Sequence, residues 1–384
     1  MHLLVIPNRL TLLCILFCMC LLVAGLWPFN FWTNNHAYLV PGGRGLKFDA
    51  PAEHSKGNLG GMVLTPNPLA CRSQDGCEKG SLTIEIILSA EDEARSCLRP
   101  IVELRRSDGT EAFSLSQWKS FLSVRSFKTP PAGSKPYREI GVEGILAAGR
   151  TRLLTIISGP RGTDTYLDGR LAKSSPRFRL LENDEALEGH RLYLGNSPDL
   201  SCPWSGSVME LAIFGKTWTS ADMEERQKPG AGGRLPCDSG QGMAVACYRF
   251  DALRGEVIAD LSGSANDLWK PAHLVFTKPV LGIPDRQSFS LLDLILNVLG
   301  FVPLGFLVVL RLSNPKLLPA WSCLLLAVVV GFGLSLAIEL TQVWLPGRDS
   351  SLSDLIANTV GTAIGGVLGI KGWRVIELLS VLSY

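Results

Sequence analysis

Carboxylate and amide side chains occur in pairs within three apolar stretches of the sequence. Each pair is three or four residues apart, a spacing that places both members on one face of a helix. The pairs are Asp293 with Asn297, Glu339 with Gln342, and Asp354 with Asn358, and Arg348 lies between the last two pairs. An ionisable group inside lipid hydrocarbon costs about 2.5–3.5 kcal/mol, so such groups turn towards the interior of a bundle and find partners there. These seven residues therefore form a candidate polar pocket.

The pocket has two interpretations. In the functional one, Arg348 forks onto a carboxylate, and Glu339, Asp354 or Asp293 is available as a general acid or base. In the structural one, the polar side chains only link neighbouring helices, and Asp354 caps its own helix. Three pairs together with an arginine favour the functional pocket, without identifying a catalytic residue.

Membrane helices are the elements that must hold these residues. A span needs about 20 predominantly apolar residues. Four stretches are long enough, at positions 10–27, 289–310, 318–345 and 352–370. The first is either a retained helix or a cleaved signal peptide. Its continuation into an aromatic cluster typical of the membrane–water boundary, at Trp27, Phe29, Phe31 and Trp32, favours a retained helix.

The distribution of positive charge predicts the orientation. Basic residues on cytoplasmic loops are the strongest topological signal. They precede the first stretch, lie between the second and third, and follow the fourth, at Arg9, Arg311, Lys316, Lys371 and Arg374. Both termini should therefore lie in the cytoplasm of a bacterium, and the protein should be a multi-pass protein of its cytoplasmic membrane. The polar pairs would then lie within roughly 12 Å of the outer face, at a rise of 1.5 Å per residue.

The centre of the chain has the pattern of an all-β domain. Partly alternating segments such as 81–88 indicate strands, and Asp168-Gly169 is a strong hairpin turn signal. The predicted fold class is an α-helical transmembrane bundle of about four helices plus an all-β jelly-roll sandwich. The expected boundaries are a first helix at 1–32, a linker at 33–45, the extracytoplasmic sandwich at 46–278, a linker at 279–287, and the remaining bundle at 288–384.

Cysteines in this central region support an oxidising compartment. Six of them, an even number, fall there: Cys71, Cys77, Cys97, Cys202, Cys237 and Cys247. Disulfides persist outside the cytoplasm. Cys71 with Cys77 and Cys237 with Cys247 are the easiest closures by sequence distance, although six cysteines allow 15 pairings.

Several classes of function are disfavoured. A formal charge of +2 without a basic, aromatic-interleaved run argues against a nucleic-acid partner. The five histidines are far apart, and the sequence has no His-Glu-x-x-His, no Cys-x-x-Cys and no Gly-x-Ser-x-Gly. No metal site and no cofactor are therefore expected from local motifs.

Ordered fragments of the central region resemble a laminin-G-like, concanavalin A-type jelly roll. They are Gly45-Leu-Lys-Phe48, Ser81-Leu-Thr-Ile-Glu-Ile86, Tyr166-Leu-Asp-Gly169, Trp204-Ser-Gly-Ser-Val208 and Leu211-Ala-Ile-Phe214. The resemblance implies binding of carbohydrate or protein, sometimes with calcium. Loop residues Asp164, Asp168, Asn196 and Asp199 would be the nearest calcium candidates, but such residues commonly form turns. The sequence has no Glu-x-Asp-x-Glu arrangement of the kind similar glycan-hydrolysing folds use.

The membrane stretches resemble the VanZ-like membrane family. The motifs are Asn297-Val-Leu-Gly-Phe-Val-Pro-Leu-Gly-Phe306, Ile338-Glu-Leu-Thr-Gln342, Arg348 and Asp354-Leu-Ile-Ala-Asn-Thr-Val-Gly361, with Trp27-Pro-Phe-Asn-Phe31 at the end of the first helix. The sandwich would then be an insertion between the first and second helices. The resemblance implies a link to glycopeptide resistance but no settled reaction.

Three functions follow from these features. The first is an envelope protein whose outward pocket engages a lipid-linked or glycan-bearing component, with a saccharide- or protein-binding β-domain outside. The second is a membrane enzyme acting on a lipid head group or lipid-linked sugar. The third is a tethered adhesion or scaffold module, which leaves the costly polar pairs unexplained. The first is favoured, and whether the protein is an enzyme stays open.

Overall fold

The computed structural model describes two units of the chain. One unit combines Met1–Trp32 with Phe276–Tyr384, and the other is Thr33–Val275. The described residues are 6–29, 31–40, 45–50, 59–71, 77–91, 94–128, 136–182, 184–227, 235, 237, 244–251, 255–274, 280–283, 291–313, 318–345 and 348–382.

The first unit is a bundle of four long apolar helices. They are α1 (Ile6–Leu26), α3 (Leu291–Leu312), α4 (Ala320–Gln342) and α5 (Leu352–Leu382). Each contains a segment long and apolar enough to cross a bilayer. Large apolar side chains stay exposed around the bundle, including Leu296, Val329 and Ile356, a surface that lipid rather than water would cover. The chain is a membrane protein.

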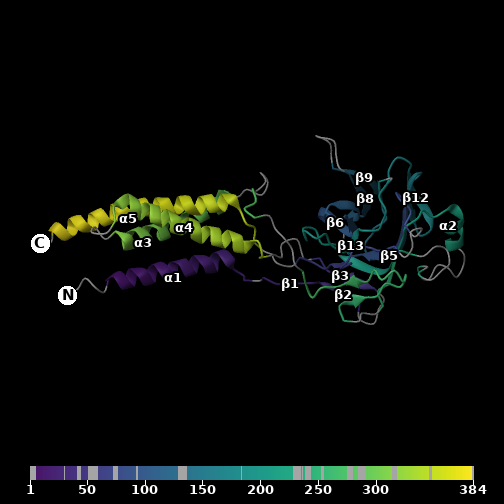
Figure 1. Cartoon of the computed structure of the whole chain (residues 1–384), viewed down its shortest axis with the longest axis horizontal. Helices are drawn as coiled ribbons and strands as arrows, with labels where there is room; N and C mark the ends of the chain where they lie inside the picture. The colour runs from purple at the N-terminus through teal and green to yellow at the C-terminus, as the bar shows by residue number, and fades with distance from the viewer. Residues whose placement is uncertain are drawn as a thin grey trace. The chain divides into compact units, whose positions relative to one another are not determined.

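The helices alternate in direction. Figure 1 shows α1 ending, α3 beginning, α4 ending and α5 beginning at one end of the bundle, while α1 begins and α5 ends at the other. The polar pairs of the sequence lie at the first of these ends. At the opposite end, Arg311 Nε donates a hydrogen bond of 2.6 Å to Thr11 Oγ1, which joins the end of α3 to the start of α1.

Glycines bring α3 and α5 into backbone contact. A Cβ added at Gly361 would lie 2.1 Å from the carbonyl oxygen of Val298, and one at Gly365 would lie 1.9 Å from that of Val302. Because no side chain fits there, the small residues set the distance between the helices.

The second unit is a two-sheet antiparallel sandwich. Within the described residues, one sheet has the order β12 (Arg170–Ser175), β11 (Gly162–Leu167), β10 (Thr151–Gly159), β5 (Leu82–Ala90), β14 (Gly206–Phe214), β3 (Leu46–Phe48) and β2 (Ala37–Leu39), and β15 (Ala246–Arg249) also pairs with β14. The other has the order β16 (Val257–Ile258), β17 (Leu268–Trp269), β4 (Val63–Leu64), β13 (Arg191–Leu194), β6 (Ala94–Arg105), β7 (Glu111–Lys119), β8 (Phe121–Phe127) and β9 (Tyr137–Val142). The predicted fold class is confirmed.

Strand β5 is buried on both faces, which explains why apolar and polar residues alternate only in part along its sequence. Ile84 and Ile86 are buried in the core between the two sheets. The opposite face of the same strand carries Glu85 and Ile87, and it is covered by α2 (Ser220–Gln227) and neighbouring residues. Arg226 of α2 places its guanidinium 3.1 Å from Glu85, whose side chain is fully buried. Burial on both faces replaces the alternation expected of a strand with one wet face.

Two features tie the sandwich together beyond the sheets. Residues 33–45, expected as a linker, contain β2 and also β1 (Thr33–Asn34), which pairs with β18 (His273–Leu274). The first and last strands of the domain therefore meet. Thr33 lies opposite Leu274, 241 residues later in the chain, and local patterns do not reveal such a pairing. Disulfides join Cys71 to Cys77, Cys97 to Cys202 and Cys237 to Cys247. Both pairs expected from sequence distance are confirmed.

Candidate functional site

Glu339 is the most deeply buried acid of the bundle among the described residues. Its exposed fraction is 1%. It lies in the last turn of α4, and its Oε2 accepts a hydrogen bond of 2.7 Å from the backbone N–H of Ser351. That N–H belongs to the segment leading into α5, where main-chain donors lack intrahelical partners. The carboxylate thus connects the end of one membrane helix to the start of the next.

Asp354 extends this arrangement towards α3. Its carboxylate lies close enough to that of Glu339 for their charges to interact. It is half-buried and accepts a side-chain hydrogen bond from Asn297, and its charge also interacts with that of Asp293. The charge of Asp354 thus interacts with one acid on each neighbouring helix, Glu339 of α4 and the exposed Asp293 of α3, and the predicted pairs lie at one end of the bundle.

Gln342 and Arg348 bind a different partner. The amide Nε2 of Gln342 donates to the carbonyl of Gly25 at 2.9 Å. Arg348 donates from Nε to the carbonyl of Trp27 at 3.0 Å and from its terminal nitrogen to that of Ala24 at 3.1 Å. These carbonyls belong to the C-terminal end of α1, where they have no intrahelical donor and where positive charge is favourable.

The position of Arg348 differs from the simplest expectation, a fork onto a carboxylate. Its two described hydrogen bonds serve main-chain carbonyls of α1, and the pairing with a carboxylate stays a prediction. Gln342 and Arg348 therefore both bond to the end of α1, and retention of the first helix stays a prediction. Every helix ends with carbonyl groups that lack an intrahelical donor. The sequence therefore did not indicate which of these carbonyls Gln342 and Arg348 would bind.

Asn358 lies one turn further into α5. Its exposed fraction is 4%, and its Nδ2 donates to Ser335 Oγ on α4 at 2.9 Å. Within the part of the chain that the structure describes, its Oδ1 has no hydrogen-bond partner, and neither has Oε1 of the buried Gln342. A buried acceptor without a donor costs about 1–3 kcal/mol. Both oxygens lie at the polar junction of the helices.

The chemistry of the site is that of an acceptor cluster. Carboxylates from Asp293, Glu339 and Asp354 and the amide oxygens of Gln342 and Asn358 supply acceptors at this end of the bundle. Such a set suits a ligand that offers hydroxyl or ammonium groups. Ser335 and Ser351 also belong to this site, although the sequence pattern of charged and amide residues did not indicate them. Single serines are common in apolar helices, so a serine in the sequence does not indicate a site. Its partners become known only when the helices are assembled.

The loop acids of the sandwich are used within the fold. Asp168 accepts from Leu153 N at 3.0 Å and pairs with Arg152 at 2.6 Å. Asn196 donates to Leu59 O at 2.7 Å, and Asp199 accepts from Ser201 N at 3.2 Å. The described residues include no group of three or more histidine, cysteine or acidic side chains arranged to hold a metal ion. These loop residues form turns in the described structure, and calcium binding stays a prediction.

The sandwich also has a cavity with an aromatic wall. It measures about 510 Å³ and lies between the β4 end and the strands β16 and β17. Trp269 lines it with 39% of its surface exposed. The indole N–H donates to Glu256 at 3.0 Å, which orients the ring. Asn67 and Asp267 line the same cavity and offer hydrogen-bonding groups beside the ring.

Comparisons with known proteins support part of this description. Residues 251–373 match the VanZ/LLP1 family model, about a third of the chain, and this range includes α3, α4 and all seven candidate pocket residues. The C-terminal region is therefore VanZ-like, as the motifs predicted. No curated protein matches the chain at a significant level.

Solved structures share limited similarity with the chain. A Trypanosoma rangeli sialidase in complex with sialic acid is 16% identical, covering 51% of this chain and 29% of its own, with a TM-score of 0.35. A Bacteroides ovatus protein described as a candidate carbohydrate binder is 15% identical, covering 59% and 57%, with a TM-score of 0.37. Domain 4 of a Geobacillus stearothermophilus arabinanase in complex with arabinotriose is 13% identical, covering 51% and 87%, with a TM-score of 0.33. The chain thus spans less than two thirds of the length of the first two of these proteins.

Proposed function

We propose that the protein uses the polar end of its VanZ-like bundle to engage a sugar-bearing lipid head group of the bacterial envelope. The observation that carries this proposal is the meeting of Glu339, Asp354 and Asp293 at one end of three membrane-competent helices. Acids that cost free energy in a bilayer are retained where they serve a partner. Sugar hydroxyls are donors, and they match the carboxylate and amide oxygens of this site.

The orientation belongs to the same proposal. We place both termini in the cytoplasm and the polar end at the outer face, where lipid-linked glycans are assembled into the envelope. The three disulfides of the sandwich support an extracytoplasmic location for that unit, because disulfides persist in oxidising compartments. A role in glycopeptide resistance, which the VanZ-like resemblance implies, would follow if the bound lipid is a cell-wall precursor.

The sandwich would contribute a second contact with glycan. The cavity beside Trp269 combines an exposed indole with Asn67 and Asp267, and an aromatic face next to polar groups suits a sugar ring, which has an apolar face and hydroxyl edges. Its volume of about 510 Å³ is within the usual range for small-ligand sites. Trp269→Ala should abolish binding to a glycan array if this cavity is the site.

The central experiment compares variants of the bundle in the intact protein. Glu339→Gln and Asp354→Asn remove charge while keeping size. Thr341→Val is the matched control, because the hydrogen bond that its hydroxyl makes among the described residues lies within α4, to Ala337 O at 2.7 Å. Labelled lipids that copurify with each variant are resolved by thin-layer chromatography, and glycopeptide susceptibility is measured in the same cells. Loss of a copurifying glycolipid in both acid variants, but not in the control, supports the proposal.

The opposite outcome is equally defined. If the acid variants retain the same lipids and the same susceptibility as wild type, the cluster only joins helices. A labelled lipid that changes chemically when the protein is present would favour the enzymatic alternative. A reporter fused within residues 348–351 that reads as cytoplasmic would overturn the orientation.

A further inference from the structure

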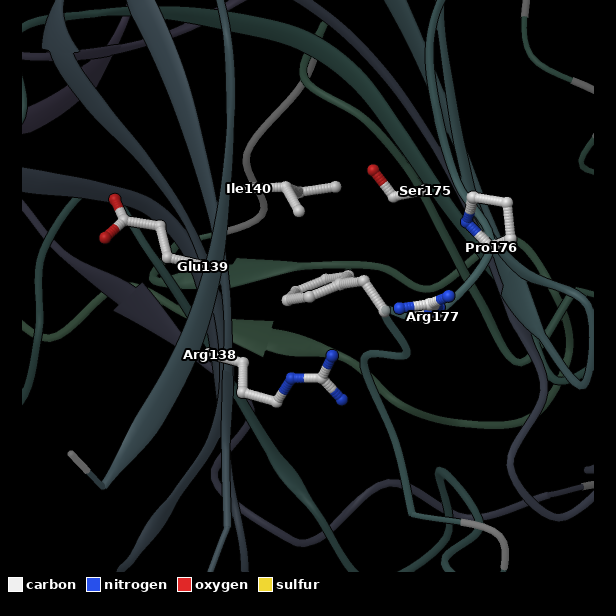
Figure 2. A pocket seen from close by; sticks show the side chains of 7 residues that line it. Arg138, Glu139, Ile140, Ser175, Pro176 and Arg177 are labelled. Atoms are coloured by element: carbon white, nitrogen blue, oxygen red, sulfur yellow. The ribbon is translucent and has the colours of Figure 1, made fainter. Parts of the chain in front are cut away.

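A second cleft lies in the sandwich where the edges of its two sheets approach each other. Strand β9 is an edge strand of one sheet, and β12 is an edge strand of the other. The cleft between them measures about 330 Å³. Its walls are Arg138, Glu139 and Ile140 on β9, and Ser175 at the end of β12 with the three residues that follow it (Figure 2). This site is separate from the bundle and from the Trp269 cavity.

The cleft is positively charged. Among the described residues, neither Arg138 nor Arg177 has an ion-pair or side-chain hydrogen-bond partner, and both are exposed. The acid that lines the cleft is already engaged, because Glu139 pairs with Arg125 at 3.2 Å on its own side of the strand. Figure 2 shows the Glu139 carboxylate turned away from the space into which Arg138 and Ile140 extend, as alternation along a strand requires.

A further cation lies where the two edges meet. Lys173 of β12 donates from Nζ to the carbonyl of Gly141 on β9 at 2.8 Å. This bond joins the edge of one sheet to the edge of the other without neutralising the lysine. The ammonium therefore adds to the positive potential along the cleft, since a carbonyl dipole does not cancel a full charge.

The wall that carries Arg177 is fixed by the fold. The Phe178 carbonyl accepts a hydrogen bond of 2.9 Å from Thr163 Oγ1, and the Phe178 N–H donates to Ser175 O at 3.1 Å. Gly162 has a φ of +111°, and a Cβ there would lie 2.5 Å from Pro176 Cα. This glycine lets the segment after β12 pack directly onto β11. The arginine is thus presented on a tight, anchored turn rather than on a free loop.

We propose that this cleft binds an acidic saccharide through its carboxylate. Arg138 and Arg177 line opposite walls of the cleft, and guanidinium forks match carboxylate geometry with two parallel hydrogen bonds. Ile140 and Pro176 supply an apolar surface for the sugar ring, and the Ser175 hydroxyl is available to a ring hydroxyl. The volume accommodates about one sugar residue or two, by comparison with common ligand sites.

The test measures binding to the intact protein in detergent by calorimetry. The probes are tetragalacturonate, its neutral methyl ester and inorganic phosphate. We expect the acid form to bind and the methyl ester to fail. Arg138→Gln and Arg177→Gln should each weaken binding about tenfold, the value of one charge-assisted hydrogen-bonding group. Binding should also weaken as salt is added, because the charges are near the surface.

A matched control separates this site from the others. Arg170→Gln removes the same charge from the start of β12, outside the cleft, and should bind the acid form like wild type. The proposal is overturned if both arginine variants bind like wild type, if the methyl ester binds as well as the acid, or if phosphate binds while tetragalacturonate does not. None of these results bears on the lipid site of the bundle.

Discussion

The backbone N–H of Ser351 donates a hydrogen bond of 2.7 Å to Oε2 of Glu339, twelve residues earlier in the chain. This bond joins the final turn of α4 to the residue that precedes α5. It satisfies a main-chain donor at a helix start with an acid that is 1% exposed. The same carboxylate therefore closes a helix junction and faces Asp354, so structure and proposed binding share one side chain.

Substitution of Glu339 should separate these two roles. Glu339→Gln keeps an oxygen for the Ser351 N–H, whereas Glu339→Ala leaves that donor unpaired and opens a cavity. We expect Ala to lower the stability of the full-length protein by about 1–3 kcal/mol more than Gln does, the cost of an orphaned buried donor. Thermal unfolding in detergent measures the difference. Equal stability of the two variants would show that the bond contributes nothing.

Gly365 tests the contact between α3 and α5. A Cβ at this position would lie 1.9 Å from Val302 O, so Gly365→Leu must separate the helices and should prevent assembly of the bundle. Gly333→Leu is the control, because a Cβ there has no neighbour within 4 Å. Protease resistance of membrane-inserted protein distinguishes them. Comparable resistance of the two leucine variants would argue against this packing.

Glu111 should make the sandwich less stable as pH rises through neutrality. Burial, and then the charge of Glu103, raise the pKa of Glu111 to about 7 from 4.5, against the opposing effects of Ser114, Arg105 and Arg125. Between those two pH values the folded state holds a proton that the unfolded chain has lost. The stability that this proton provides is therefore complete below about pH 4.5 and is lost as pH rises through about 7.

Glu111→Gln should remove that dependence and unfold at a higher denaturant concentration than wild type at about pH 8. Denaturation of the full-length protein followed by tryptophan fluorescence from about pH 5 to about pH 8 measures it. Glu185 does not interfere, because hydrogen bonds from His190 and Arg106 overcome its burial and lower its pKa to about 2. Its contribution changes only in acid. Parallel pH profiles for wild type and Glu111→Gln would refute the assignment.

The disulfides should contribute unequally to stability. Cys97–Cys202 closes a sequence separation of 105 residues, whereas Cys71–Cys77 closes one of 6. On the chain-entropy account, a loop of about 100 residues is worth about 4.7 kcal/mol and one of 15 residues about 3 kcal/mol. Replacing Cys97 and Cys202 with serine should therefore lower the unfolding midpoint more than the same change at Cys71 and Cys77. The reverse order would show that local strain, not loop length, decides.

Local patterns in the sequence determined the elements and their polar positions. Runs of apolar residues indicated the four spans, because a bilayer requires that length and composition wherever the chain folds. The i, i+3 and i, i+4 spacing placed Asp293 with Asn297 and Glu339 with Gln342 on common faces, since helix geometry is fixed. The two disulfides between cysteines close in sequence were also predicted as the easiest closures, because short loops close most easily.

Only the tertiary structure decided which partners these residues have. Arg348 bonds to the carbonyls of Trp27 and Ala24, more than 300 residues earlier, because assembly of the bundle brings the end of α1 beside it. Strand β1 likewise meets β18, from the other end of the sandwich sequence, although residues 33–45 were expected to be a linker. A sequence pattern indicates on which face of its own helix or strand a side chain lies. It does not indicate which neighbouring element that side chain contacts, because hydrogen-bond partners depend on the distances between elements.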